Sequence, residues 1–73
     1  MNQKRESRLI SVIYKYAVLN GCKTQKAQAE RALIDRNCYA RRLHNPGLFT
    51  LDELEKVQRA FRIPWEEISE ALA

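Results

Sequence analysis

The chain has 73 residues and carries 13 lysines and arginines against nine aspartates and glutamates, for a formal net charge of +4. This length predicts a single domain over residues 1–73, and it excludes a catalytic cleft between domains and an array of repeats. A composition of 45% hydrophobic and 30% charged residues is typical of a folded globular protein. Only two glycines and two prolines interrupt the chain, which favours helices joined by short turns.

The charge is unevenly distributed along the chain. Residues 1–50 hold ten lysines and arginines against three acidic residues, whereas residues 51–73 hold three against six. A basic region beside an acidic one indicates an anionic partner, such as nucleic acid or an anionic membrane face.

No targeting segment is predicted. The apolar run from Leu9 to Leu19 is interrupted by polar residues such as Lys15, so it is neither a signal peptide nor a membrane span. Two cysteines, Cys22 and Cys38, are too few for a disulfide framework. We therefore expect a cytoplasmic protein with both thiols reduced.

Apolar residues recur at helical spacing, and no segment alternates with the period of a strand. Residues 1–6 are expected to form a flexible N-terminus. Thr50 and Glu53 form a predicted capping box, in which Phe49 would pack on Leu54 as a hydrophobic staple. The sequence therefore predicts an all-α, compact five-helix bundle. Its helices are expected over residues 7–19, 25–32, 36–44 and 51–61, and from residue 64 or 65 onward.

Three of these helices are expected to bury one apolar face each. The inward residues are expected to be Leu9, Val12, Ile13, Tyr16 and Ala17 in the first helix, Leu51, Leu54, Val57 and Phe61 in the fourth, and Trp65, Ile68 and Leu72 in the last. Trp65 has two interpretations, a core residue that closes the bundle or a contact in a dimer interface.

Residues 24–45 read TQKAQAERALIDRNCYARRLHN, which predicts two short helices separated by a tight turn. This stretch resembles the helix-turn-helix of the Cro/CI-type family, also called lambda-repressor-like or XRE, and the resemblance covers about residues 7–72. The residues that carry it are Thr24 and Gln25 at the start of the helix over residues 25–32, Ala29 where the two helices of the motif cross, residues 34–37 at the entry to the helix over residues 36–44, and residues 46–54 and 61–63. The resemblance implies a lambda-repressor-like bundle. It also implies a small transcriptional regulator, repressor-like and of phage or mobile-element type, that binds double-stranded DNA sequence-specifically with residues 36–44 in the major groove.

Three residues depart from the family pattern. Leu33 occupies a turn position where glycine is usual, and leucine resists a positive φ, so we expect the turn to differ in shape. Gln28 and Arg42 stand where apolar core residues are usual. We expect Leu43 to take over part of the packing of position 42, with the Arg42 stem along the surface. The departures keep a second interpretation open, a protein-interaction module (adaptor or anti-repressor) that has this fold without DNA binding.

Helix geometry selects the candidate DNA contacts. Asn37 and Arg41 share one face of a helix over residues 36–44, and Tyr39 lies about 200° from Asn37, so Tyr39 and Leu43 are expected to anchor the helix. A recognition helix reads base edges, where arginine pairs with guanine and asparagine with adenine. The base-reading candidates are Arg36, Asn37, Cys38 and Arg41, although a small half-buried thiol is an equal interpretation of Cys38. The phosphate-contacting candidates are Lys23, Thr24, Gln25, Lys26 and Asn45.

Other kinds of site are not expected. Cys22, Cys38 and His44 are the only soft metal ligands and lack a fourth partner, and His44 has no nucleophile to pair with. We therefore expect a protein that is not an enzyme and binds no metal or cofactor. A membrane partner is not expected, because the apolar stripe of the first helix is needed for the core.

The roles of two surfaces stay open. Lys4, Arg5 and Arg8 form either a basic arm on DNA or a solvated terminus. Related proteins often bind palindromic sites as dimers, and the last helix is the candidate surface for a homodimer. The residues concerned are Trp65, Ile68 and Leu72.

Overall fold

A computed structural model describes residues 3–73, which form five α-helices and one 3-10 helix. In chain order they are α1 (Gln3–Leu19), α2 (Gln25–Ala32), α3 (Arg36–His44), η1 (Pro46–Leu48), α4 (Leu51–Phe61) and α5 (Trp65–Leu72). No residue of this range lies in a strand, which confirms the all-α prediction. The first helix begins earlier than expected: residues 3–6, which we expected to be flexible, belong to α1. Residues 1–2 of that predicted N-terminus lie outside the described residues.

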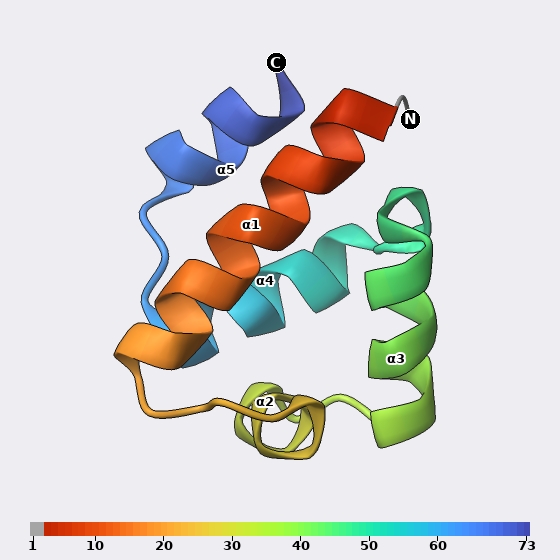
Figure 1. Ribbon diagram of the computed structural model, residues 1–73, viewed down its shortest axis with the longest axis vertical. Helices are drawn as coiled ribbons and strands as arrows, with labels where there is room; N and C mark the ends of the chain where they lie inside the picture. Colours follow the sequence, from red (N-terminus) through yellow and green to blue (C-terminus); the bar gives the residue numbers. More distant parts are fainter. Residues whose placement is uncertain (1–2) are drawn as a thin grey trace.

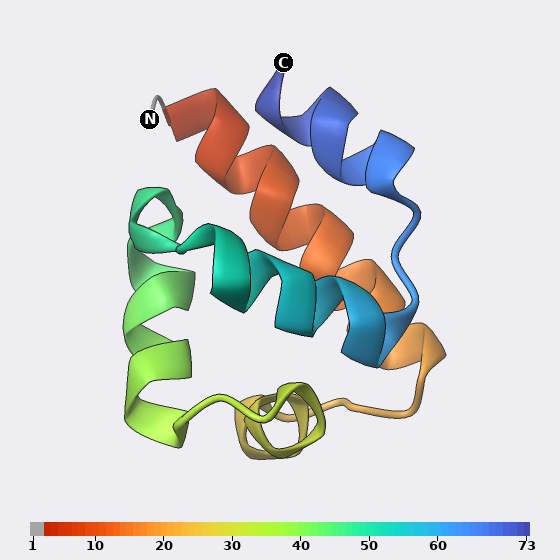
Figure 2. The same cartoon turned by 180° about the vertical axis from the view of Figure 1, so that it is seen from behind.

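The helices are arranged around α1, which runs diagonally through the molecule (Figure 1). α5 lies along one side of α1, and α2 and α3 lie on the side away from α5. α4 crosses α1 and is nearer the viewer when the molecule is seen from behind (Figure 2). The unit formed by α2 and α3 is therefore at the edge of the molecule, with α4 and α1 as its support.

Arg8 joins α1 to the end of α5. Its Nε donates to the carbonyl oxygen of Ala71 at 3.2 Å, and its Nη2 donates to that of Ala73 at 2.8 Å. This differs from both interpretations of Arg8, a basic arm and a solvated terminus, because the guanidinium caps carbonyls at a helix C-terminus instead. Among the described residues, none of the helices has the length and apolar character needed to cross a membrane.

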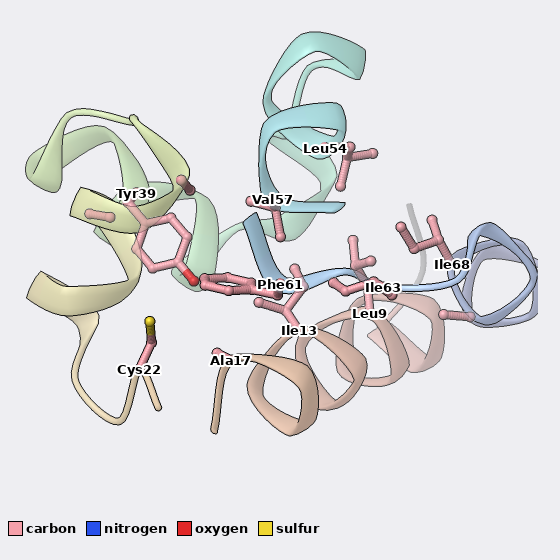
Figure 3. Packing of buried hydrophobic residues seen from close by; sticks show 13 residues of the cluster. Leu9, Ile13, Ala17, Cys22, Tyr39, Leu54, Val57, Phe61, Ile63 and Ile68 are labelled. Atoms are coloured by element: carbon pink, nitrogen blue, oxygen red, sulfur yellow. The ribbon is translucent and has the colours of Figure 1, made fainter. Parts of the chain in front are cut away.

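The core lies between α1, α4 and the neighbouring helices (Figure 3). Of the expected inward residues of α1 and α4, those confirmed as buried are Leu9, Ile13, Ala17, Leu54, Val57 and Phe61. Val12 and Tyr16 of α1 are only partly buried and pack against this core. The prediction for Leu51 is wrong, because its side chain is 86% exposed. Leu51 lies about 120° around the helix from Val57, so the first turn of α4 carries it away from the core.

α5 meets the expectation only in part. Ile68 is buried and Leu72 packs against the core, but Trp65 is 49% exposed and does not close the bundle. Trp65 is the first residue of α5, and Ala71 takes the remaining buried position on that helix. The small side chain of Ala71 allows α5 to approach α1 closely.

Three helices end in the same backbone motif. Gly21, Leu33 and Arg62 each follow a helix with a positive φ, of 82°, 60° and 54° respectively. The next residue then donates its N–H to a carbonyl five residues back: Cys22 to Ala17, Ile34 to Ala29 and Ile63 to Gln58, at 2.8–3.1 Å. This is the Schellman pattern, in which an apolar residue after the left-handed one packs back on the helix. Each of these apolar residues is buried or packs against the core.

Candidate nucleic-acid interface

The start of α2 is fixed by Thr24. Its Oγ1 accepts the N–H of Ala27 at 3.1 Å, so the helix begins at Gln25 as the sequence predicts. Lys23, Thr24, Gln25 and Lys26 are all exposed. The four phosphate-contacting candidates of this segment therefore lie together at the N-terminal end of a helix, where the helix dipole favours an anion.

The turn between α2 and α3 keeps the conformation that glycine usually supplies. We expected Leu33 to change the shape of this turn, but Leu33 adopts φ 60° and ψ 39°, in the left-handed region. Its side chain is 82% exposed, so no neighbouring group opposes this conformation. The leucine is accommodated at a cost in backbone energy rather than by a different turn.

The start of α3 is fixed by Asp35. One carboxylate oxygen, Oδ2, accepts the N–H groups of Asn37 and Cys38 at 3.1 and 3.2 Å. The cap stabilises the first turn of the helix that carries the base-reading candidates. It also places a carboxylate at this N-terminus, so any phosphate contact there would meet a negative charge.

The two faces of α3 are as expected. Arg36, Asn37 and Arg41 are exposed, whereas Tyr39 is fully buried. Cys38 is half-buried, between the two faces, which agrees with the second interpretation of its thiol and leaves only part of it accessible. Leu43 packs against the core, as we expected of an anchoring residue, and the other anchor is Tyr39.

Tyr39 is anchored by a buried hydrogen bond. Its hydroxyl donates to Oε1 of Gln28 at 2.7 Å, and Nε2 of Gln28 donates to the carbonyl oxygen of Cys22 at 3.2 Å. Gln28 is only 2% exposed. Figure 3 shows the Tyr39 ring pointing inward from α3, with Cys22 nearby. The departure at position 28 is therefore a core residue whose polar atoms are paired inside the protein.

The other end of α3 is joined to α4 by Arg42. Its Nε lies 2.8 Å from Oε1 of Glu53, and the same oxygen accepts the N–H of Thr50 at 3.0 Å. The predicted capping box of Thr50 and Glu53 is present. Burial alone would raise the pKa of Glu53, but the hydrogen bonds from Arg42 and Thr50 outweigh it and hold that pKa below its ordinary value. The expected surface stem of Arg42 thus ends in an ion pair with α4.

The remaining candidate follows α3. Asn45 is exposed, and its backbone N–H donates to the carbonyl of Arg41 at 2.9 Å, where the helix ends. The structure thus places the nine candidates on one continuous segment of two helices and their flanks, in three groups. These groups are the start of α2, the first turns of α3 and the residue after α3.

Sequence reasoning missed two contributors to this segment, Gln28 and Glu53. Gln28 was recognised only as a departure, since a lone glutamine among alanines gives no sign of its partner 11 residues later. Glu53 was recognised as a capping residue but not as the partner of Arg42, also 11 residues away. The available signal was that two polar residues, Gln28 and Arg42, occupy positions where core residues are usual. A polar partner for each, Tyr39 and Glu53, lies on the next α-helix along the chain.

Comparison with known protein families, curated proteins and solved structures finds no match for this chain. The expected resemblance to Cro/CI-type domains therefore stays a prediction from the sequence. Within residues 3–73, no three histidine, cysteine or acidic side chains are grouped as metal ligands would be.

Proposed function

We propose that the protein binds double-stranded DNA sequence-specifically, as a small transcriptional regulator, with α3 in the major groove. The observation that carries the proposal is the division of α3 into two faces. Tyr39 is held in the core, and Arg36, Asn37 and Arg41 are exposed on a helix of nine residues, about 13 Å long. An α-helix with its side chains is about 10–12 Å in diameter, so it fits into the major groove, which is about 12 Å wide, and its exposed side chains reach base edges.

The neighbouring groups support this orientation. Lys23 and Lys26 are exposed at the start of α2, and Asn45 is exposed beyond the end of α3. Groups that flank a reading helix on both sides serve to hold it in register through phosphate contacts. We assign base readout to Arg36, Asn37, Arg41 and the accessible part of Cys38. We assign phosphate contacts to Lys23, Thr24, Gln25, Lys26 and Asn45.

A salt titration of binding to random-sequence duplex tests the proposal. If about five phosphates are neutralised per chain, log K falls against log[salt] with a slope of roughly −4 to −5. Absence of binding at low salt would contradict DNA binding and favour the protein-interaction module.

Selection of bound duplexes from a random pool then supplies a target for two substitutions. Arg41→Ala is expected to lose about 1–3 kcal/mol of discrimination at one base pair, because a bidentate base contact is removed. Lys26→Ala is expected to weaken binding to all duplexes alike and to reduce the salt slope by about 1. Identical behaviour of the two variants would show that α3 is oriented differently.

We further propose that the protein pairs through α5 on palindromic DNA. Ile68 is buried within the chain, so the available apolar surface is that of Trp65 and the half-buried Leu72. Sedimentation of the protein with a selected palindromic duplex distinguishes two chains per duplex from one. A selected site without two-fold symmetry, bound by one chain, would contradict pairing.

A further inference from the structure

Few buried side chains hold α3 in place. Tyr39 is the only fully buried residue of the helix, whereas α1 and α4 bury three residues each. The burial of Tyr39, with Leu43 packed against the core, turns one face of α3 inward. The hydrophobic effect is itself non-directional, so the exact angle at which α3 presents its outer face depends on directional contacts as well.

The directional contacts on the inner side of α3 come from two neighbours. Near the end of the helix, Arg42 reaches Glu53 in a partly buried ion pair. Nearer its start, the hydroxyl of Tyr39 donates to Oε1 of Gln28, and Gln28 in turn donates to the carbonyl of Cys22. This second contact is the buried one, and it lies beside the turns that carry Asn37 and Arg41.

The buried chain of hydrogen bonds is complete. No buried side-chain nitrogen or oxygen within the described residues lacks a partner, so Gln28 and Tyr39 satisfy each other and the Cys22 carbonyl. Burial also raises the pKa of Tyr39, so its hydroxyl keeps the proton that it donates. A continuous chain of hydrogen bonds therefore connects the Cys22 carbonyl, in the segment after α1, through Gln28 of α2 to Tyr39 of α3.

We propose that Gln28 is a positioning residue for DNA recognition: through Tyr39 it fixes the rotation of α3, and hence the direction in which Asn37 and Arg41 point. Tyr39 lies about 200° around the helix from both reading side chains, so a rotation that moves its hydroxyl moves them by the same angle. The inference rests on the proposed DNA binding, and it assigns a specificity role to a residue that touches no DNA.

A merely structural role for Gln28 makes a different prediction. Replacing both partners of a buried hydrogen bond by apolar groups of similar shape is nearly neutral for stability, although Gln28→Met also leaves the Cys22 carbonyl without its donor, which lowers stability in both cases. If Gln28 only fills the core, the double variant Gln28→Met/Tyr39→Phe should keep both its fold and its DNA selectivity. If Gln28 positions α3, the double variant keeps its fold and loses selectivity.

The experiment compares the wild type, the single variant Tyr39→Phe and the double variant. Tyr16→Phe is the matched control, since it removes a tyrosine hydroxyl from α1 on the side of α5. A duplex is first selected with the wild-type protein. The ratio of Kd values is then measured between that duplex and one altered at the base pair that depends on Arg41.

The wild-type ratio is expected to be about tenfold, the order of one bidentate base contact. We expect it to fall at least about threefold in the single and double variants and to stay unchanged in Tyr16→Phe, with Kd for random-sequence duplex within about twofold throughout. Amide residual dipolar couplings of the free proteins should show α3 reoriented relative to α4 in the two position-39 variants only. An unchanged ratio with wild-type couplings would overturn the inference.

The two proposals fail in distinguishable ways. If the wild type binds no duplex, the proposed function fails, and the dipolar couplings still test the hold of Gln28 on α3. If the double variant does not fold, Tyr39→Phe decides the outcome, because it retains the ring and removes one oxygen atom. If the wild type binds selectively and Tyr39→Phe binds with the same selectivity, DNA binding is supported and the positioning role of Gln28 is excluded.

Discussion

The α2–α3 and α4–α5 units are both pairs of helices joined by three residues. In each link a left-handed residue, Leu33 or Arg62, is followed by an isoleucine whose N–H closes the Schellman pattern. The two units differ sharply in charge: residues 25–44 hold five lysines and arginines against two acidic residues, whereas residues 51–72 hold three against six.

The second helices of the two units are also held differently. α5 is fixed on α1 by two buried apolar residues, Ile68 and Ala71, and by the hydrogen bonds of Arg8 at its end. α3 has one fully buried residue, Tyr39, and is held further by the hydrogen bond of its hydroxyl and by the ion pair of Arg42. Two similar turns thus lead to one helix packed as scaffold and one presented to solvent. Because the turn is common to both units, the turn alone does not account for the proposed function. We assign that function to the outer face of α3 and to the residues that anchor this helix.

The largest effect is expected in the apolar scaffold. Phe61→Ala removes a fully buried aromatic ring from α4 and should lower the free energy of unfolding by about 3–5 kcal/mol, measured in urea by circular dichroism. Leu51→Ala, at an exposed position of the same helix, is the control and should stay within about 0.5 kcal/mol. A loss below about 1 kcal/mol for Phe61→Ala would show that α4 is not the scaffold on which the comparison depends.

An intermediate effect is expected where the two units meet, at Glu53. Its pKa is held below the ordinary value, so the carboxylate stabilises the fold above the pKa of the unfolded chain and loses this contribution as pH falls through the folded-state pKa. Glu53→Gln should therefore be less stable than the wild type at neutral pH, and the difference should shrink in acid below about pH 4.5. Glu55→Gln, in an exposed pair with Arg59, is the control and should change the free energy of unfolding by less than about 0.5 kcal/mol. A difference that persists unchanged at pH 3 would contradict the role of the Glu53 charge.

The smallest effect is expected in the shared turn. Leu33→Gly and Arg62→Gly should each raise the free energy of unfolding by about 0.5–1 kcal/mol. Glycine accepts a positive φ without the steric cost that a Cβ adds, and this gain exceeds the stability that glycine loses through its larger conformational entropy in the unfolded chain. Leu33→Ala keeps the Cβ and should not give this gain. Thermal unfolding of the three variants measures the difference, and unequal gains at the two glycines would show that the turns are less alike than their dihedral angles suggest.

The sequence predicted most helix boundaries because they depend on local chemistry. Thr24, Asp35 and Thr50 cap the helices that follow them, and each cap involves atoms no more than three residues away. The start of α1 was missed since residues 3–6 are polar and carry no capping signal. Leu51 was misplaced because apolar character was taken for burial, although its helix turns it away from the core.

The exposed face of the candidate site followed from helical periodicity alone. Arg36, Asn37 and Arg41 are where the spacing predicted, but the anchors behind them were not predictable in the same way. Whether a buried glutamine is tolerated depends on where Tyr39 and the Cys22 carbonyl lie in space, and sequence spacing does not give that position. The role of these residues in binding DNA stays a prediction.

The oxygen of Glu53 that serves both Arg42 and Thr50 has a consequence for how this chain can vary. One atom is the acceptor for a helix start and for a contact between helices, so substitutions at positions 42, 50 and 53 are coupled rather than additive. A change at Glu53 alone removes two functions at once, while a loss of Arg42 leaves the cap in place. In related sequences, positions 42 and 53 are therefore expected to change together, whereas position 50 can vary among residues that cap a helix.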